Sequence, residues 1–257
     1  MGRRRRKGFA IMATVQFRRI LLTLLSLLAA AVTVLAFEHV GGTPASARGD
    51  RPERLATADP PTVLFVGDSF TAGAGVQNVI DAYPALIAKS ARWDVKVDAQ
   101  GATGFIADGR GTGNGDTSKL IDRLPNDKQA YPDVNLLVVD AGRCDLEFPT
   151  DDIAAAMAEY LQQARMQWPD AEIVQILPAF MTASPYDAYP DLLQKMKSNL
   201  DVVNGTLIDP FAEGWYANAD VDSMVDSDNV HPNWLGSAHI ADRLVESFHA
   251  KGLISGE

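Results

Sequence analysis

Two loops of the sequence hold the three side-chain types that nucleophilic acyl transfer needs. Ser69 stands in a short turn, Gly67-Asp68-Ser69, directly after an apolar run. Asp228 and His231 share one polar stretch near the C-terminal end. A serine hydroxyl needs a neighbouring base, histidine is the natural base near neutral pH, and a carboxylate fixes the tautomer of the imidazole. These residues therefore predict Ser69 as a nucleophile, His231 as its base and Asp228 as the acid that orients His231.

The elements around these loops alternate between strands and helices. Apolar runs and helical periodicity predict strands at 62–66, 94–97, 134–139, 172–177 and 206–208, and helices at 76–92, 118–124, 150–167, 190–200 and 232–251. Pro84 marks either a kink in the first helix or its true start, and Thr150 is the expected N-cap of the third. Mostly apolar strands that alternate with helices predict an α/β fold, a parallel sheet covered on both faces. Ser69 follows the first strand, and open α/β folds build their sites at the carboxyl ends of strands.

Two polar segments resemble ligand sites but have simpler explanations. Residues 109–115 alternate glycine with other residues but lack the lysine of a phosphate-binding loop, so we expect a flexible loop at the rim of the site. Asp220, Asp222, Asp226 and Asp228 lack the spacing of a calcium loop. We therefore expect a solvated acidic loop and no metal site.

The N-terminal segment has the pattern of an export signal. Basic residues precede an uncharged stretch from Ile20 to Phe37, and small residues ending at Ala47 form a candidate cleavage site. The stretch has a length between that of a signal peptide and that of a spanning helix. We expect a signal peptide or signal-anchor at 1–47, a linker at 48–60 and one domain at 61–254. Both alternatives place the domain outside the cytoplasm, secreted or held by a single membrane anchor at Ile20 to Phe37.

Charge and cysteine content exclude some classes of protein. Residues 48–257 carry 16 Lys and Arg against 32 Asp and Glu, a net charge of −16. Nucleic-acid binding needs clustered Lys and Arg, so we expect no nucleic-acid partner. The chain has one cysteine, Cys144, and therefore no intrachain disulfide.

Four short blocks together resemble the SGNH/GDSL hydrolase superfamily. They are Gly67-Asp68-Ser69, Gly101 after the second strand, Gly142-x-x-Asp145 after the third, and Asp228-x-x-His231-Pro232. The resemblance covers roughly residues 60–250. It implies a flavodoxin-like, three-layer α/β/α domain with a parallel sheet of about five strands that hydrolyses esters without metal or organic cofactor. It assigns the catalytic roles to Ser69, His231 and Asp228, and an oxyanion hole to the Ser69 N–H, the Gly101 N–H and an asparagine of the third block.

The third block departs from that pattern. Cys144 stands where the superfamily has asparagine, and a thiol is a weak donor that cannot replace an amide N–H. Losing one such donor typically lowers turnover about 10²–10³-fold. The enzyme is then slow, recruits another donor, or no longer hydrolyses esters. Arg143 and Thr103 are candidate substitutes, and Cys144 as a nucleophile in its own right is a less favoured alternative.

These observations leave more than one function open. The favoured one is an exported serine esterase acting on acyl or O-acetyl esters of a small molecule or carbohydrate, including cell-envelope polymers. An O-acyltransferase would use the same three residues, with a sugar hydroxyl in place of water. A binding module of the same fold, weakly active or inactive because of Cys144, is the alternative from another class.

Overall fold

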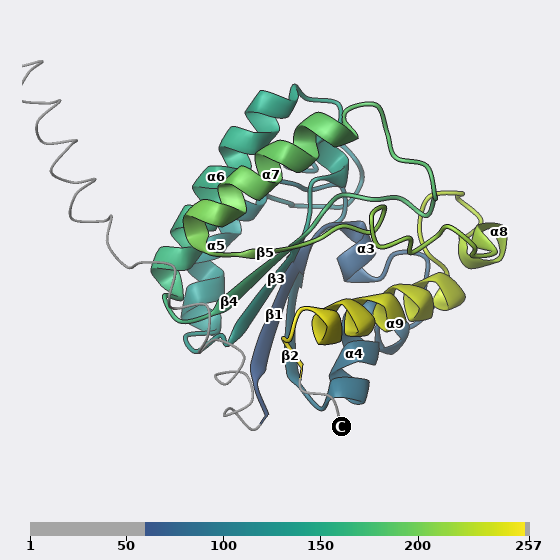
Figure 1. The fold of residues 1–257 in the computed structure, drawn as a ribbon, viewed down its shortest axis with the longest axis horizontal. Helices are drawn as coiled ribbons and strands as arrows, with labels where there is room; N and C mark the ends of the chain where they lie inside the picture. The colour runs from purple at the N-terminus through teal and green to yellow at the C-terminus, as the bar shows by residue number, and fades with distance from the viewer. Residues whose placement is uncertain (1–59, 255–257) are drawn as a thin grey trace, which may run out of the picture. The chain divides into compact units, whose positions relative to one another are not determined.

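The computed structural model describes residues 60–254, which form a five-stranded sheet with helices on both faces (Figure 1). The strand order is β2-β1-β3-β4-β5, and every neighbouring pair is parallel. The strands are β1 (Thr62–Gly67), β2 (Asp94–Ala99), β3 (Leu136–Asp140), β4 (Glu172–Ile176) and β5 (Thr206–Ile208). This confirms the predicted three-layer α/β/α architecture, with the flavodoxin-like strand order.

The longer helices form two layers, one on each face of the sheet (Figure 1). They are α4 (Tyr83–Ala91), α5 (Leu120–Ala130), α6 (Thr150–Gln167), α7 (Tyr189–Val203) and α9 (Trp234–Ala250). Successive strand residues point to opposite faces. Leu64 and Val66 of β1 therefore pack in the core under α5, α6 and α7, whereas Val63 and Phe65 pack in the core under α4 and α9.

The short elements lie at the ends of the strands. They are α3 (Ser69–Ala72), the 3₁₀ turns η2 (Val79–Asp81) and η3 (Arg143–Asp145), and α8 (Val221–Met224). The chain passes from β1 to helices on one face and from β3 to helices on the other, so the carboxyl ends of these neighbouring strands border the crevice where doubly wound sheets bind ligands. Because α3 follows β1 and η3 follows β3, both turns border this crevice.

The observed helices differ from the predicted ones in three main respects. The segment 76–92 is divided into η2 and α4, and Pro84 lies in the first turn of α4, where its missing N–H costs nothing. The helix expected at 118–124 continues to Ala130 with Pro125 inside it. Thr150 is not the N-cap of α6: Pro149 holds that position, and the Thr150 hydroxyl bonds Asp191 and Lys195 instead.

Residues 1–59 lie outside the described residues, and with them the expected leader, the cleavage site after Ala47 and the anchor at Ile20 to Phe37. Among residues 60–254, no helix has both the length and the apolar character needed to cross a bilayer. The leader and the linker stay predictions.

Two fully buried tyrosines provide a test of this packing. The Tyr83 hydroxyl donates to Asp140 Oδ2 at 2.8 Å and lies 2.9 Å from Thr71 Oγ1, whereas the Tyr160 hydroxyl has no hydrogen-bond partner among the described residues. We expect Tyr83→Phe to lower the free energy of unfolding by about 1–3 kcal/mol, because it leaves a buried carboxylate short of a donor. Tyr160→Phe, the matched control, should be neutral or stabilising. Urea unfolding measures the free energy of unfolding of both variants. Equal losses of stability would contradict the hydrogen-bonding role assigned to the Tyr83 hydroxyl.

Candidate active site

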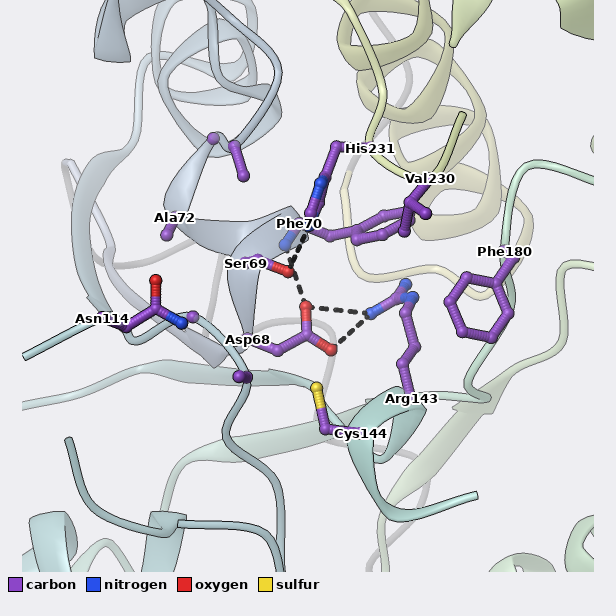
Figure 2. A pocket seen from close by; sticks show the side chains of 14 residues that line it. Asp68, Ser69, Phe70, Ala72, Asn114, Arg143, Cys144, Phe180, Val230 and His231 are labelled. Carbon is purple, nitrogen blue, oxygen red and sulfur yellow. Dashed lines mark hydrogen bonds and ion pairs between the residues drawn. The ribbon is translucent and has the colours of Figure 1, made fainter. Parts of the chain in front are cut away.

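Ser69, His231 and Asp228 form one chain of hydrogen bonds (Figure 2 draws Ser69 and His231). Ser69 Oγ lies 2.8 Å from His231 Nε2, although the residues are 162 positions apart. Asp228 Oδ2 lies 2.5 Å from His231 Nδ1. The structure thus brings together the three residues that the sequence singled out, in the order hydroxyl, imidazole and carboxylate that a Ser-His-Asp triad requires.

The loop that carries His231 is shaped by Asp228. The other oxygen of this carboxylate, Oδ1, accepts the backbone N–H of Val230 at 2.8 Å and of His231 at 2.9 Å. These bonds and the contact with the imidazole stabilise the charged form, so the His231 ring and both N–H groups lower the pKa of Asp228 to about 2. Asp228 is consequently ionised throughout the neutral pH range.

A glycine lets the serine loop approach this histidine loop. Gly75 has a φ of +92°, and a Cβ there would lie 2.4 Å from the Pro232 carbonyl oxygen and 3.1 Å from His231 Cβ. Only glycine fits both the conformation and the space. The backbone after α3 therefore packs directly against the backbone that presents His231.

Beneath Ser69 lies a buried ion cluster centred on Arg143. Its guanidinium contacts Asp68 Oδ2 at 3.2 Å and Asp140 Oδ1 at 2.7 Å, and its Nε donates to the Ala179 carbonyl at 2.6 Å (Figure 2 draws Arg143 and Asp68). Burial raises the pKa of Asp68 to about 6 despite the opposing charge of Arg143. Burial alone would lower the pKa of Arg143, but Asp140 and Asp68 raise it well above its usual value. Arg143 therefore stays charged.

This cluster sets the direction of the Ser69 turn. Asp68 is the N-cap of α3, and its Oδ1 accepts the Phe70 N–H at 2.9 Å. The Arg143 guanidinium lies 4.3 Å from the centre of the Phe70 ring, and the centre of the His231 ring lies 5.7 Å from the same point. Phe70 consequently links the buried cation to the imidazole.

Asp145 holds the backbone of residues 105–107, a few residues after Gly101. Its fully buried carboxylate accepts three backbone N–H groups, those of Phe105, Ile106 and Ala107, at 2.7, 3.1 and 2.8 Å. Ala102, which follows Gly101, has a φ of +61°, a conformation that costs an alanine about 1–2 kcal/mol. The fixed segment maintains this strained turn at the edge of the cavity.

Ser69 and His231 lie at a cavity of about 590 Å³, within the size range of small-molecule sites. Gly101, Cys144 and Asn114 line it as well, and partly exposed Phe180 and Val230 add apolar surface. Residues 60–254 contain no cluster of His, Cys, Asp or Glu that could hold a metal ion.

Both substitute donors that the sequence suggested are engaged elsewhere. Arg143 is bound by two carboxylates and a carbonyl. Thr103 is fully buried, and its hydroxyl donates to the Gln100 carbonyl at 2.8 Å. Asn114, an amide side chain in the cavity wall, was missed, although the rim location predicted for loop 109–115 agrees with its position.

A family model described as the GDSL-like lipase/acylhydrolase family matches residues 65–239, and the chain belongs to this family. A relative named GDSL lipase Rv0518, from Mycobacterium tuberculosis (strain ATCC 25618 / H37Rv), is 25% identical over 214 residues, which are 80% of this chain and 88% of the relative. Family and site together identify an ester-hydrolysing enzyme.

Solved structures share the fold at low sequence identity. An active-site mutant of a family two carbohydrate esterase from Clostridium thermocellum has a TM-score of 0.58 at 16% identity, and the match covers 76% of this chain and 65% of that one, slightly under two thirds of its length. Another structure of a family two carbohydrate esterase from this organism contains cellohexaose. TesA has a TM-score of 0.55 at 17% identity, covering 74% of this chain and 99% of TesA.

The environment of Cys144 disfavours its thiolate form. Burial, with the charges of Asp68 and Asp145, raises the pKa of Cys144 to about 12, and only the thiolate is an efficient nucleophile. We expect iodoacetamide at pH 7.5 to alkylate the native protein about 10³-fold more slowly than an ordinary thiol with a pKa of about 8.5. Because Cys144 is the one cysteine of the chain, the mass increase reports it alone.

The control for this labelling is the same protein in urea, where alkylation should reach the ordinary rate. Rapid labelling of the native protein would instead support a nucleophilic Cys144.

Proposed function

We propose that this protein is an exported serine esterase that removes small acyl groups, such as O-acetyl, from a carbohydrate or another small-molecule ester. The observation that carries the proposal is the 2.8 Å contact between Ser69 Oγ and His231 Nε2 at the cavity. It gives the hydroxyl a base within proton-transfer distance. The carbohydrate esterase relatives support a sugar ester, and the N-terminal signal pattern supports export.

In the proposed reaction, Ser69 Oγ attacks the ester carbonyl carbon while His231 Nε2 takes the hydroxyl proton. The tetrahedral intermediate collapses, the bond to the alcohol oxygen breaks, and His231 returns the proton to the leaving alcohol. Water then attacks the acyl-enzyme by the same route and releases the acid. Asp228, ionised because of its low pKa, stabilises the imidazolium in both halves.

Replacement of the nucleophile tests this mechanism. We expect Ser69→Ala to lower kcat for p-nitrophenyl acetate by about 10³-fold or more, because alanine has no hydroxyl to attack the ester. Mass spectrometry of the wild-type chain after reaction with an ethyl phosphonate ester should show one adduct, on Ser69. Equal turnover of the two proteins would refute the proposal, whereas acetyl transfer to an added sugar at the expense of acetate release would favour an acyltransferase.

Asp228 and Asp226 form a matched pair in the histidine loop. Asp228→Asn should lower kcat/KM by about 10²–10⁴-fold, because an amide no longer favours the productive tautomer or the imidazolium. Asp226→Asn removes the same charge from the same loop, but the described partners of the ring nitrogens are Asp228 and Ser69 and do not include Asp226, so activity should stay within about threefold of wild type. Steady-state kinetics at constant ionic strength compares kcat/KM of the two variants. Equal losses of kcat/KM would show a general effect of loop charge and would contradict a specific role for Asp228.

A further inference from the structure

We propose that Asn114 supplies the third oxyanion donor of this esterase, in place of a side chain at position 144. The proposal rests on the serine mechanism above, because an oxyanion forms only if Ser69 attacks the ester. It assigns a catalytic function to a loop that the sequence alone placed only at the rim.

Two backbone donors are free beside the nucleophile. Within residues 60–254, neither the Ser69 N–H nor the Gly101 N–H donates to a protein acceptor, and both residues line the cavity. Cys144 at the third corner is protonated and a weak donor. A carbonyl oxygen that gains charge there finds no amide at position 144, and Arg143 in the same turn is bound to Asp68, Asp140 and the Ala179 carbonyl.

Asn114 lies against Gly101. A Cβ on Gly101 would lie 3.1 Å from both Cγ and Nδ2 of Asn114, so the amide packs over the glycine whose N–H is one of the donors. Asn114 lines the same cavity as Ser69 and His231. In Figure 2 its amide nitrogen is on the side that faces Ser69 and Asp68.

The loop fixes this amide and leaves one hydrogen for a ligand. Asn114 Nδ2 donates to Thr112 Oγ1 at 2.9 Å, and Thr112 Oγ1 donates to the Gly109 carbonyl at 2.5 Å. No other acceptor for Nδ2 exists among the described residues, so its second N–H is available. The glycines of the loop allow this fold because each has a positive φ; they are Gly109, Gly111, Gly113 and Gly115.

Removal of the donor is the direct test. We expect Asn114→Ala and Asn114→Asp to lower kcat for p-nitrophenyl acetate about 10–100-fold, with KM within about threefold. This is at or below the usual effect of an oxyanion donor, because Asn114 is exposed and water partly replaces it. The matched control is Arg110→Ala, in the same loop but outside the cavity wall, with activity expected to stay within about twofold of wild type.

Restoring a donor at position 144 provides a second test. Cys144→Asn in the wild-type background gives the reference change in kcat, which should be the smaller one because Asn114 already serves the oxyanion. In the Asn114→Ala background, the same substitution should raise kcat about tenfold. Such non-additivity is the signature of two side chains serving one oxyanion.

The outcomes separate this proposal from the proposed function. If Ser69→Ala loses activity and both Asn114 variants keep it, the donor role of Asn114 is overturned and the serine mechanism stays intact. The donor role is also overturned if the Asn114 variants affect KM and leave kcat unchanged, or if Arg110→Ala loses as much activity as they do. It is overturned as well if the effects of Asn114→Ala and Cys144→Asn on kcat are additive. Full activity of Ser69→Ala overturns both proposals.

Discussion

The buried Arg143 guanidinium is the interaction on which the site depends. It lies between the carboxylate of Asp68, directly after β1, and that of Asp140, at the end of β3, and it reaches the carbonyl of Ala179 beyond β4. Removing one partner of a buried ion pair typically costs about 3–5 kcal/mol. One cation therefore fixes three strand ends relative to one another.

The positions of Ser69 and His231 follow from this fixed point. Asp68 caps the short helix that begins with Ser69, and the ring of the next residue, Phe70, contacts both Arg143 and His231. A four-residue helix has little stability of its own, since helix nucleation is costly. Tertiary contacts with a buried charge, rather than local propensity, hold Ser69 in place.

The same turn after β3 also explains why a thiol faces the cavity at position 144. Arg143 is held inward by the two carboxylates, Asp145 is held inward by three backbone N–H groups, and Cys144 between them faces the cavity. The turn thus has a structural function, and position 144 offers only a thiol. An amide from another loop, as we propose for Asn114, would meet this need without changing the turn.

The sequence by itself determined the layers and the five strands and singled out Ser69, Asp228 and His231 as candidates, because apolar periodicity and side-chain chemistry are local properties. Thr206–Ile208 was predicted with its exact bounds, whereas the N-terminus of α6 was not, since Thr150 bonds side chains of α7. Only the tertiary structure decided that Arg143 and Thr103 are engaged and that Asn114 lies over Gly101. The physical reason is that a donor's availability depends on acceptors distant in sequence, which no local pattern records.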